Sequence, residues 1–105
     1  MATITGNIDD KLDAIKAVLG EYEHVNHGAV ATLYRQNSVS VRVRIIDPAY
    51  FGLDKPERHA KAWKYLGKLP EDVQADISML ALLAPEEENR SFANFMFEER
   101  EPSKL

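Results

Sequence analysis

The chain contains no cysteine, and this absence excludes several classes of chemistry. A protein without thiols has no disulfide framework, no thiolate nucleophile, no zinc finger and no iron–sulfur site built from cysteines alone. No apolar run approaches the roughly 20 residues that span a bilayer, so we expect no membrane partner. Residues 1–6 lack the basic start and the apolar stretch of a secretory signal, which predicts a cytoplasmic protein.

The motifs of common enzymes are also missing. The chain has only five glycines, and they form neither a phosphate-binding loop nor a nucleophile elbow. His24 and His27 stand three residues apart, but no helical pattern covers them, so we assign no metal site to this pair. We therefore expect neither an enzyme nor a resident cofactor.

Charge is distributed unevenly along this chain, whose formal net charge is −4. Residues 53–70 contain two acidic and five basic side chains, whereas residues 71–105 contain nine acidic and three basic ones. The acidic final third argues against broad binding of polyanions but leaves room for one local basic patch. Such a patch predicts weak, salt-dependent nucleic-acid binding, and the alternative is a solvated charged surface.

A helix is predicted near the start of the chain. Its apolar positions recur at helical spacing and are Ile8, Leu12, Ile15 and Leu19. Asn7 or Asp9 is the expected N-cap, because either side chain can accept a hydrogen bond from the first turn. Gly20 is the expected end of the helix, since glycine suits the residue after the last turn.

Two strands follow, because the period of the apolar residues changes to two. The strands are predicted at residues 29–34 and 39–46, with a hairpin turn at 36–38. The second strand alternates cleanly, so its apolar residues share one face while Arg42 and Arg44 share the other.

The most clearly marked element is a helix predicted from Asp54 to about Lys68. Asp54 can cap its first turn, and Glu57 can close a capping box. One stripe of this helix consists of His59, Ala62, Trp63, Leu66 and Leu69, and the opposite side consists of Lys61, Lys64 and Lys68. We therefore expect the His59 ring and the Trp63 side chain to face the interior.

The last part of the chain contains one buried strand and an ambiguous end. Pro70 opens a short helical turn, and residues 77–83 are apolar except for Ser78, which predicts a strand covered on both faces. A helical connection of this kind usually joins parallel strands. Residues 92–96 fit a helical face and a strand equally well. We expect residues 89–105 to form a docking segment or a tail.

The start of the central helix resembles the signature of the BolA-like proteins. The chain reads Tyr50-x-Gly52-x5-Arg58-His59, then Trp63 and Leu66, and later Ala84-Pro85-Glu86-Glu87. Over roughly residues 12–87, the resemblance implies an α+β fold with a three-stranded mixed sheet packed by helices. The implied order is α-β-β-α-α-β, the type II KH arrangement, which agrees with the predicted elements. It also implies a non-enzymatic regulatory protein whose partner is a monothiol glutaredoxin.

The chain departs from that family at the positions of its metal ligands. BolA-like proteins share an iron–sulfur cluster through a histidine just before the last strand, and Asp76 stands at that position here. Residues 36–38 supply neither the histidine nor the cysteine that the family places in the loop between the first two strands. We therefore expect no shared cluster, and His59 and Asp76 are the only weak metal candidates.

Two functions remain open from the sequence. The first is a regulatory interaction module, and the alternative is a nucleic-acid-binding regulator that uses the basic face of the central helix. A KH loop would read Gly-x-x-Gly, but Gly67-Lys68-Leu69-Pro70 ends in a proline, which has no N–H to donate to phosphate. The tentative binding residues are Arg42, Arg44, Arg58, His59, Lys61, Lys64 and Lys68. We expect a single domain over residues 1–105, and we give no weight to the peroxisomal form of Ser103-Lys104-Leu105.

Overall fold

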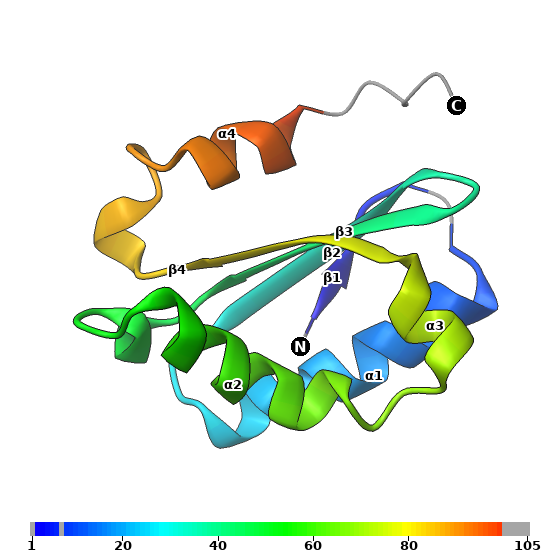
Figure 1. The fold of residues 1–105 in the computed structure, drawn as a ribbon, viewed down its shortest axis with the longest axis horizontal. Helices are drawn as coiled ribbons and strands as arrows, with labels where there is room; N and C mark the ends of the chain where they lie inside the picture. Colours follow the sequence, from blue (N-terminus) through cyan, green and yellow to red (C-terminus); the bar gives the residue numbers. More distant parts are fainter. Residues whose placement is uncertain (1, 7, 100–105) are drawn as a thin grey trace.

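The computed structural model describes residues 2–6 and 8–99 and contains a four-stranded mixed sheet with helices on both faces (Figure 1). In chain order the elements are β1 (Thr3–Ile4), α1 (Asp10–Val25), β2 (Val30–Asn37), β3 (Ser40–Ile46), the 3₁₀ turn η1 (Pro48–Tyr50), α2 (Lys55–Leu66), α3 (Glu71–Asp76), β4 (Ile77–Leu83), the 3₁₀ turn η2 (Pro85–Glu87) and α4 (Phe92–Glu98). The predicted α+β class is confirmed. The predicted three strands in α-β-β-α-α-β order are wrong, because β1 precedes that series and α4 follows it.

The sheet has the strand order β1-β2-β3-β4, so β1 and β4 are its two edges. The β2–β3 pair is an antiparallel hairpin whose turn lies at Ser38 and Val39, slightly later than predicted. The parallel pairing of β3 with β4 through a helical connection is confirmed. The sequence did not reveal β1, because two residues are too few to show an alternation.

Helix α1 is longer than predicted. Asp9 caps it by accepting a hydrogen bond from the Leu12 N–H at 2.9 Å, as one of the two expected caps. The helix passes through Gly20 and ends only at Val25, so the predicted end at Gly20 is wrong. Gly20 remains helical at a modest cost in backbone entropy, and five buried side chains on both sides of it hold the helix on the sheet.

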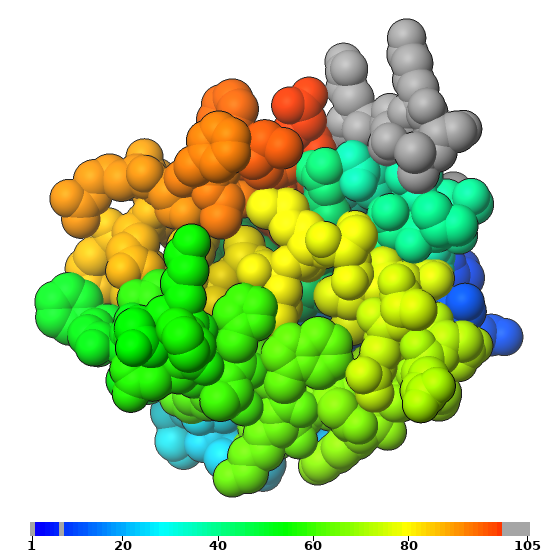
Figure 2. Space-filling view, in the orientation of Figure 1, coloured from blue at the N-terminus to red at the C-terminus, as the bar shows by residue number. Residues whose placement is uncertain are grey.

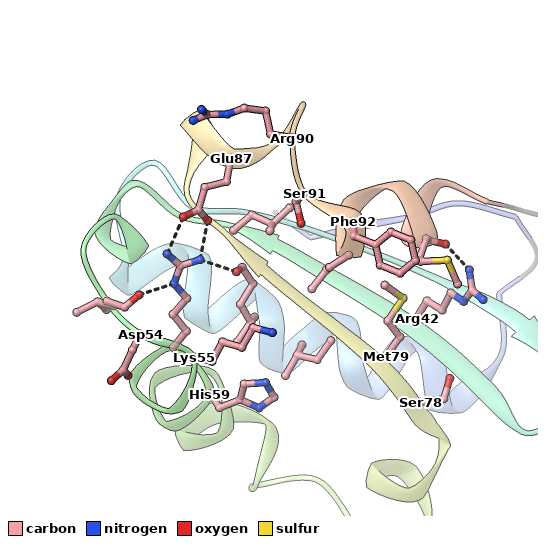
Figure 3. A pocket seen from close by; sticks show the side chains of 18 of the residues that line it. Arg42, Asp54, Lys55, His59, Ser78, Met79, Glu87, Arg90, Ser91 and Phe92 are labelled. Carbon is pink, nitrogen blue, oxygen red and sulfur yellow. Dashed lines mark hydrogen bonds and ion pairs between the residues drawn. The ribbon is translucent and has the colours of Figure 1, made fainter.

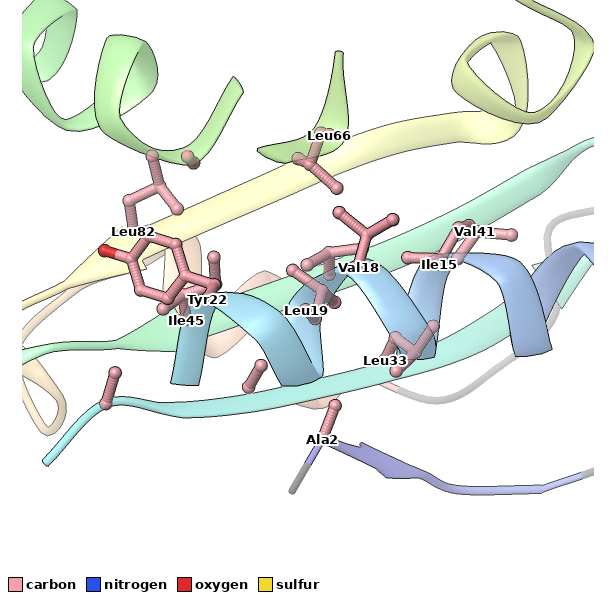
Figure 4. Close-up of a cluster of buried hydrophobic side chains, with 14 of the residues drawn as sticks. Ala2, Ile15, Val18, Leu19, Tyr22, Leu33, Val41, Ile45, Leu66 and Leu82 are labelled. Carbon is pink, nitrogen blue, oxygen red and sulfur yellow. The ribbon is translucent and has the colours of Figure 1, made fainter. Parts of the chain in front are cut away.

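The main core lies between one face of the sheet and helices α1 and α2 (Figure 4). The alternation predicted for β3 is confirmed, because Val41, Val43 and Ile45 are fully buried in this core. Their partners from α1 include Leu12, Ile15, Val18, Leu19 and Tyr22. Burial of such side chains is the dominant favourable contribution to folding.

The second face of the sheet is covered in part by α4, which resolves the ambiguity at residues 92–96 in favour of a helix (Figure 1). Phe97 is fully buried there, with its ring 5.1 Å from the Tyr34 ring in an edge-to-face arrangement. Ala81 and Leu83 of β4 are buried on the same face. Residues 100–105, which include Ser103-Lys104-Leu105, lie outside the described residues.

Candidate functional site

The start of α2 has the predicted cap, but the helix is rotated about its axis relative to the prediction. Asp54 accepts from the Glu57 N–H at 2.9 Å while Glu57 accepts from the Asp54 N–H at 3.1 Å, so the capping box is confirmed. His59 is exposed and Trp63 is only half-buried, so the predicted inward orientation of the histidine is wrong. The buried positions of this helix are instead centred on Ala62 and Leu66.

The rotation follows from a polar cluster beneath α2. The Asp47 side chain is 1% exposed and accepts a 2.6 Å hydrogen bond from the Tyr22 hydroxyl. The Lys61 ammonium lies 3.2 Å from the same carboxylate oxygen, and the Tyr22 hydroxyl is 2.8 Å from that of Tyr50. A buried carboxylate needs such partners, so Lys61 points beneath the helix and not into solvent as predicted.

The tyrosines of this cluster are held in their neutral form. Burial is the main cause that raises the pKa of Tyr50 to about 12, and burial raises the pKa of Tyr22 further. The hydrogen bond to Asp47 acts in the same direction on Tyr22. With Asp47 and Lys61 the tyrosines tie α1, η1 and α2 together, and the full burial of both tyrosines removes them from contact with a large ligand.

Arg42 and Arg44 lie on the sheet face opposite α2, where they bind the C-terminal helix. The Arg42 guanidinium donates to the carbonyl oxygens of Met96 and Glu99. Arg44 donates to the Asn94 side chain at 2.9 Å and stacks over Phe97 at 4.8 Å from the ring centroid. Both arginines are therefore half-buried parts of the α4 interface.

The predicted basic residues do not converge into one patch. Lys61 is paired with Asp47, and Lys68 lies 3.3 Å from Glu21. Lys64 is exposed on α2, whereas Arg42 and Arg44 are on the other side of the sheet. Because two of the lysines are paired with acids and the sheet separates the lysines from the arginines, these candidates form no continuous patch of unpaired basic side chains.

The two weak metal candidates are also separate. The Asp76 Oδ2 atom lies 3.1 Å from Arg35 and 3.5 Å from Lys11, so this oxygen is engaged by two cations. His59 is exposed on α2. Across residues 2–6 and 8–99, no group of three histidine, aspartate or glutamate side chains is placed to hold a metal ion.

The structure instead shows a cleft of about 1170 Å³ along β4, which we call the β4 cleft. Figure 2 shows the yellow atoms of β4 between the green atoms of α2 and the orange atoms of α4. The lining of the β4 cleft includes residues 78–83 of β4, the start of α2 and the α4 residues Phe92, Ala93 and Met96. Since β4 is an edge strand, the cleft gives access to its outer backbone edge.

One end of the β4 cleft is closed by Arg58. Its guanidinium forms two hydrogen bonds with the Glu87 carboxylate, at 2.6 and 2.9 Å, and donates to the Leu82 carbonyl at 2.9 Å. A third donor binds the Leu53 carbonyl at 3.0 Å. The hydrogen bonds from Arg58 lower the pKa of Glu87 to about 2, so this carboxylate is ionised at neutral pH.

The two walls of the β4 cleft differ in chemistry (Figure 3). Lys55 and His59 come from α2 on one side of β4, and Phe92 comes from α4 on the other. Phe92 is 76% exposed, and Met79 lies near it on the sheet. The sequence prediction included Arg42, Arg58 and His59, which line the cleft, but missed Phe92, Met79 and Lys55. The phenylalanine-rich end was the available signal, but its partner surface was not visible without the fold.

Comparisons with known proteins do not identify a family. The chain matches no family model, and no curated protein and no solved structure matches it either. The BolA-like resemblance therefore stays a prediction from the residues quoted above. None of the helices in the described part of the chain is both long and apolar enough to cross a bilayer.

Proposed function

We propose that this protein is a non-enzymatic interaction module that binds a partner protein in the β4 cleft. The observation that supports this function is the coincidence of an open strand edge, a cleft of about 1170 Å³ and the exposed Phe92 ring in one place. Concave, largely apolar surfaces with a few polar groups are typical of binding sites. An exposed apolar side chain such as Phe92 gains by burial against a partner.

A monothiol glutaredoxin is the partner that the BolA-like resemblance implies. The test is a titration of the ¹⁵N-labelled protein with a purified monothiol glutaredoxin, followed by NMR. We expect the shifted amide signals to cluster on β4 and on the starts of α2 and α4. Shifts confined to other surfaces would contradict the β4 cleft as the binding site, and an unchanged spectrum would contradict this partner.

Phe92 and Phe95 provide a matched pair of variants for this titration. Both side chains are on α4 and largely exposed, but only Phe92 lines the β4 cleft. Phe92→Ala should weaken binding about tenfold or more, as the loss of an aromatic contact does. Phe95→Ala should leave the affinity within a factor of about two, since surface substitutions elsewhere have small effects.

Nucleic-acid binding is the alternative function, and the same labelled protein tests it. Arg42 and Arg44 serve the α4 interface, while Lys61 and Lys68 are paired with acids, so we expect no tight complex with DNA or RNA. A double substitution of the exposed Lys64 and Lys68, which leaves the buried Lys61–Asp47 contact in place, should therefore change little in binding to a short oligonucleotide. Tight binding at physiological salt that this substitution abolishes would favour the regulator instead.

A further inference from the structure

The geometry points to strand addition: we propose that an extended segment of the partner protein pairs with the outer edge of β4. Its apolar side chains would face the α4 wall of the cleft, and its carboxylates would face the α2 wall. This inference rests on the proposed function, because it specifies how the same cleft recognises its partner. Main-chain hydrogen bonds supply affinity in this mode of binding, and side chains on the two walls supply specificity.

Two hydrogen bonds fix which backbone groups of β4 face outward. The Leu83 carbonyl accepts from the Asp47 N–H at 2.9 Å on the β3 side, whereas the Leu82 carbonyl accepts from Arg58 on the cleft side. Because the direction of backbone groups alternates along a strand, the N–H and C=O of Leu80 and the N–H of Leu82 also face the cleft. Within the described part of the chain, no turn or loop backbone binds these groups.

The open part of the edge is short and closed at both ends. Arg58 occupies the Leu82 carbonyl at one end. At the other end the register with β3 shifts between Ile77 and Met79, which is a bulge. Both features are common devices that protect strand edges from unwanted pairing. They leave the N–H and C=O of Leu80 and the N–H of Leu82 open, within a stretch of about 13 Å that suits a strand of about four residues.

The α4 wall of the cleft favours apolar side chains. Phe92 and Met96 line it from α4, and Met79 lines it from β4. The two arginines on this side of the cleft are engaged by main-chain carbonyl oxygens, Arg42 by Met96 and Arg90 by Glu86. Figure 3 shows Phe92 and Met79 on the same side of the cleft. Since side chains of an added strand alternate between its faces, every second residue of the partner segment would contact this wall.

The α2 wall favours carboxylates. Lys55 and His59 are exposed on it, and Lys55 makes no ion pair among the described residues. The two acids that line the cleft are already engaged, because Asp54 caps α2 and Glu87 binds Arg58. The remaining α2 wall is therefore complementary to negative charge, although the whole chain has a formal net charge of −4.

A single extended segment suits this site better than a second copy of the chain. The β4 edge lies between α2 and α4, as Figures 2 and 3 show. A second copy would bring its own α2 and α4 along with its β4 edge, and these helices would have to fit beside those of the first copy. An extended segment has no such flanks and can reach the Leu80 backbone.

The probe is an acetylated and amidated six-residue peptide that alternates valine and glutamate. We expect the Leu80 amide to exchange its hydrogen more slowly when this peptide is bound. At a peptide concentration about 100-fold above its Kd, the exchange should slow by about 100-fold, since the amide then exchanges only from the free protein. The Phe92→Ala variant should bind the peptide more weakly than the Phe95→Ala variant.

Modified peptides separate backbone pairing from other modes of binding. In one version the valine nitrogens are methylated, and in the other the glutamate nitrogens are methylated. Strand pairing uses one of these sets of N–H groups, so one version should bind and the other should not. Equal binding of both versions would contradict strand addition. A valine–lysine peptide that binds as well as the valine–glutamate peptide would contradict the preference for carboxylates.

The remaining outcomes distinguish this inference from the proposed function. If the glutaredoxin shifts the amide signals of the β4 cleft but the peptide leaves the hydrogen exchange of the Leu80 amide unchanged, strand addition is wrong and the interaction module stands. If neither has an effect at the cleft, strand addition and the glutaredoxin as partner are both wrong. If Leu80 exchange slows with protein concentration alone, the occupant is a second copy and strand addition by a partner is wrong.

Discussion

At the scale of single residues, Asp47 connects three elements through one buried carboxylate. Oδ2 accepts from Tyr22 at 2.6 Å and lies 3.2 Å from Lys61, while Oδ1 accepts from the Ala49 N–H at 2.9 Å. Removal of one partner leaves the others without compensation in a place that excludes water. The cluster is therefore expected to be sensitive even to the loss of a single oxygen.

Tyr22→Phe tests this sensitivity. The substitution keeps the ring in the core but removes the hydroxyl that donates to Asp47, so it should lower the free energy of unfolding by about 1–3 kcal/mol. Tyr65→Phe is the matched control, because no hydrogen bond of the Tyr65 hydroxyl is found among the described residues, and it should cost less than about 0.5 kcal/mol. Urea denaturation measures both, and equal effects would contradict the proposed importance of the cluster.

Glu87→Gln tests the ion pair at the end of the cleft through its pH dependence. Folding lowers the pKa of Glu87 from 4.5 to about 2, mainly through Arg58, so the ionised form stabilises the native state. This contribution is complete above pH 4.5 and is lost as the pH falls to about 2. The difference in urea midpoint between wild type and variant should shrink over that range.

The neighbouring Glu86→Gln is the control for that measurement. The Glu86 side chain is exposed and makes no ion pair among the described residues, so its substitution should leave the pH profile of the wild type unchanged. A Glu87→Gln profile that runs parallel to the wild type from pH 7 to pH 2 would rule out the ion pair as a source of stability.

At the scale of elements, several features that depend on residues close in sequence were predicted correctly, whereas the rotation of α2 about its axis, which depends on a long-range contact, was not. The capping box of Asp54 and Glu57 and the alternation in β3 depend on neighbours in sequence, and both are confirmed. The predicted inward orientation of the helix face through His59 was wrong, because the spacing of apolar residues contains no information about polar contacts with other elements. The contact of Lys61 with buried Asp47 comes from a residue 14 positions away and turns the helix.

The docking of α4 gives a prediction of its own. Phe97 is the buried anchor of this seven-residue helix, so Phe97→Ala should release α4 while the main core between α1, α2 and the sheet remains. Hydrogen exchange should become fast in α4 and stay slow in β2 and β3. Phe95→Ala, which removes an exposed ring, should change neither. A uniform loss of protection across the sheet would contradict a separately docked helix.

At the scale of the whole molecule, the β4 cleft is formed by segments that are distant in sequence. The cleft is bounded by the start of α2, by β4 and by α4 (Figure 3). The sequence identified two of these as a helix and a strand, but it left residues 92–96 undecided between helix and strand. It also predicted Arg42 and Arg44 as binding residues, since nothing in their alternation shows that α4 covers them.

The most direct test of the β4 cleft as a binding site assumes no particular partner. A displayed library of random peptides is selected on the immobilised protein, and the enriched peptides are then measured against Phe92→Ala and Phe95→Ala. We predict that enriched peptides lose about tenfold or more in affinity for the Phe92→Ala protein and keep their affinity for the Phe95→Ala protein. A selection that enriches no peptide, or peptides that bind both variants equally, would contradict the β4 cleft as the functional surface.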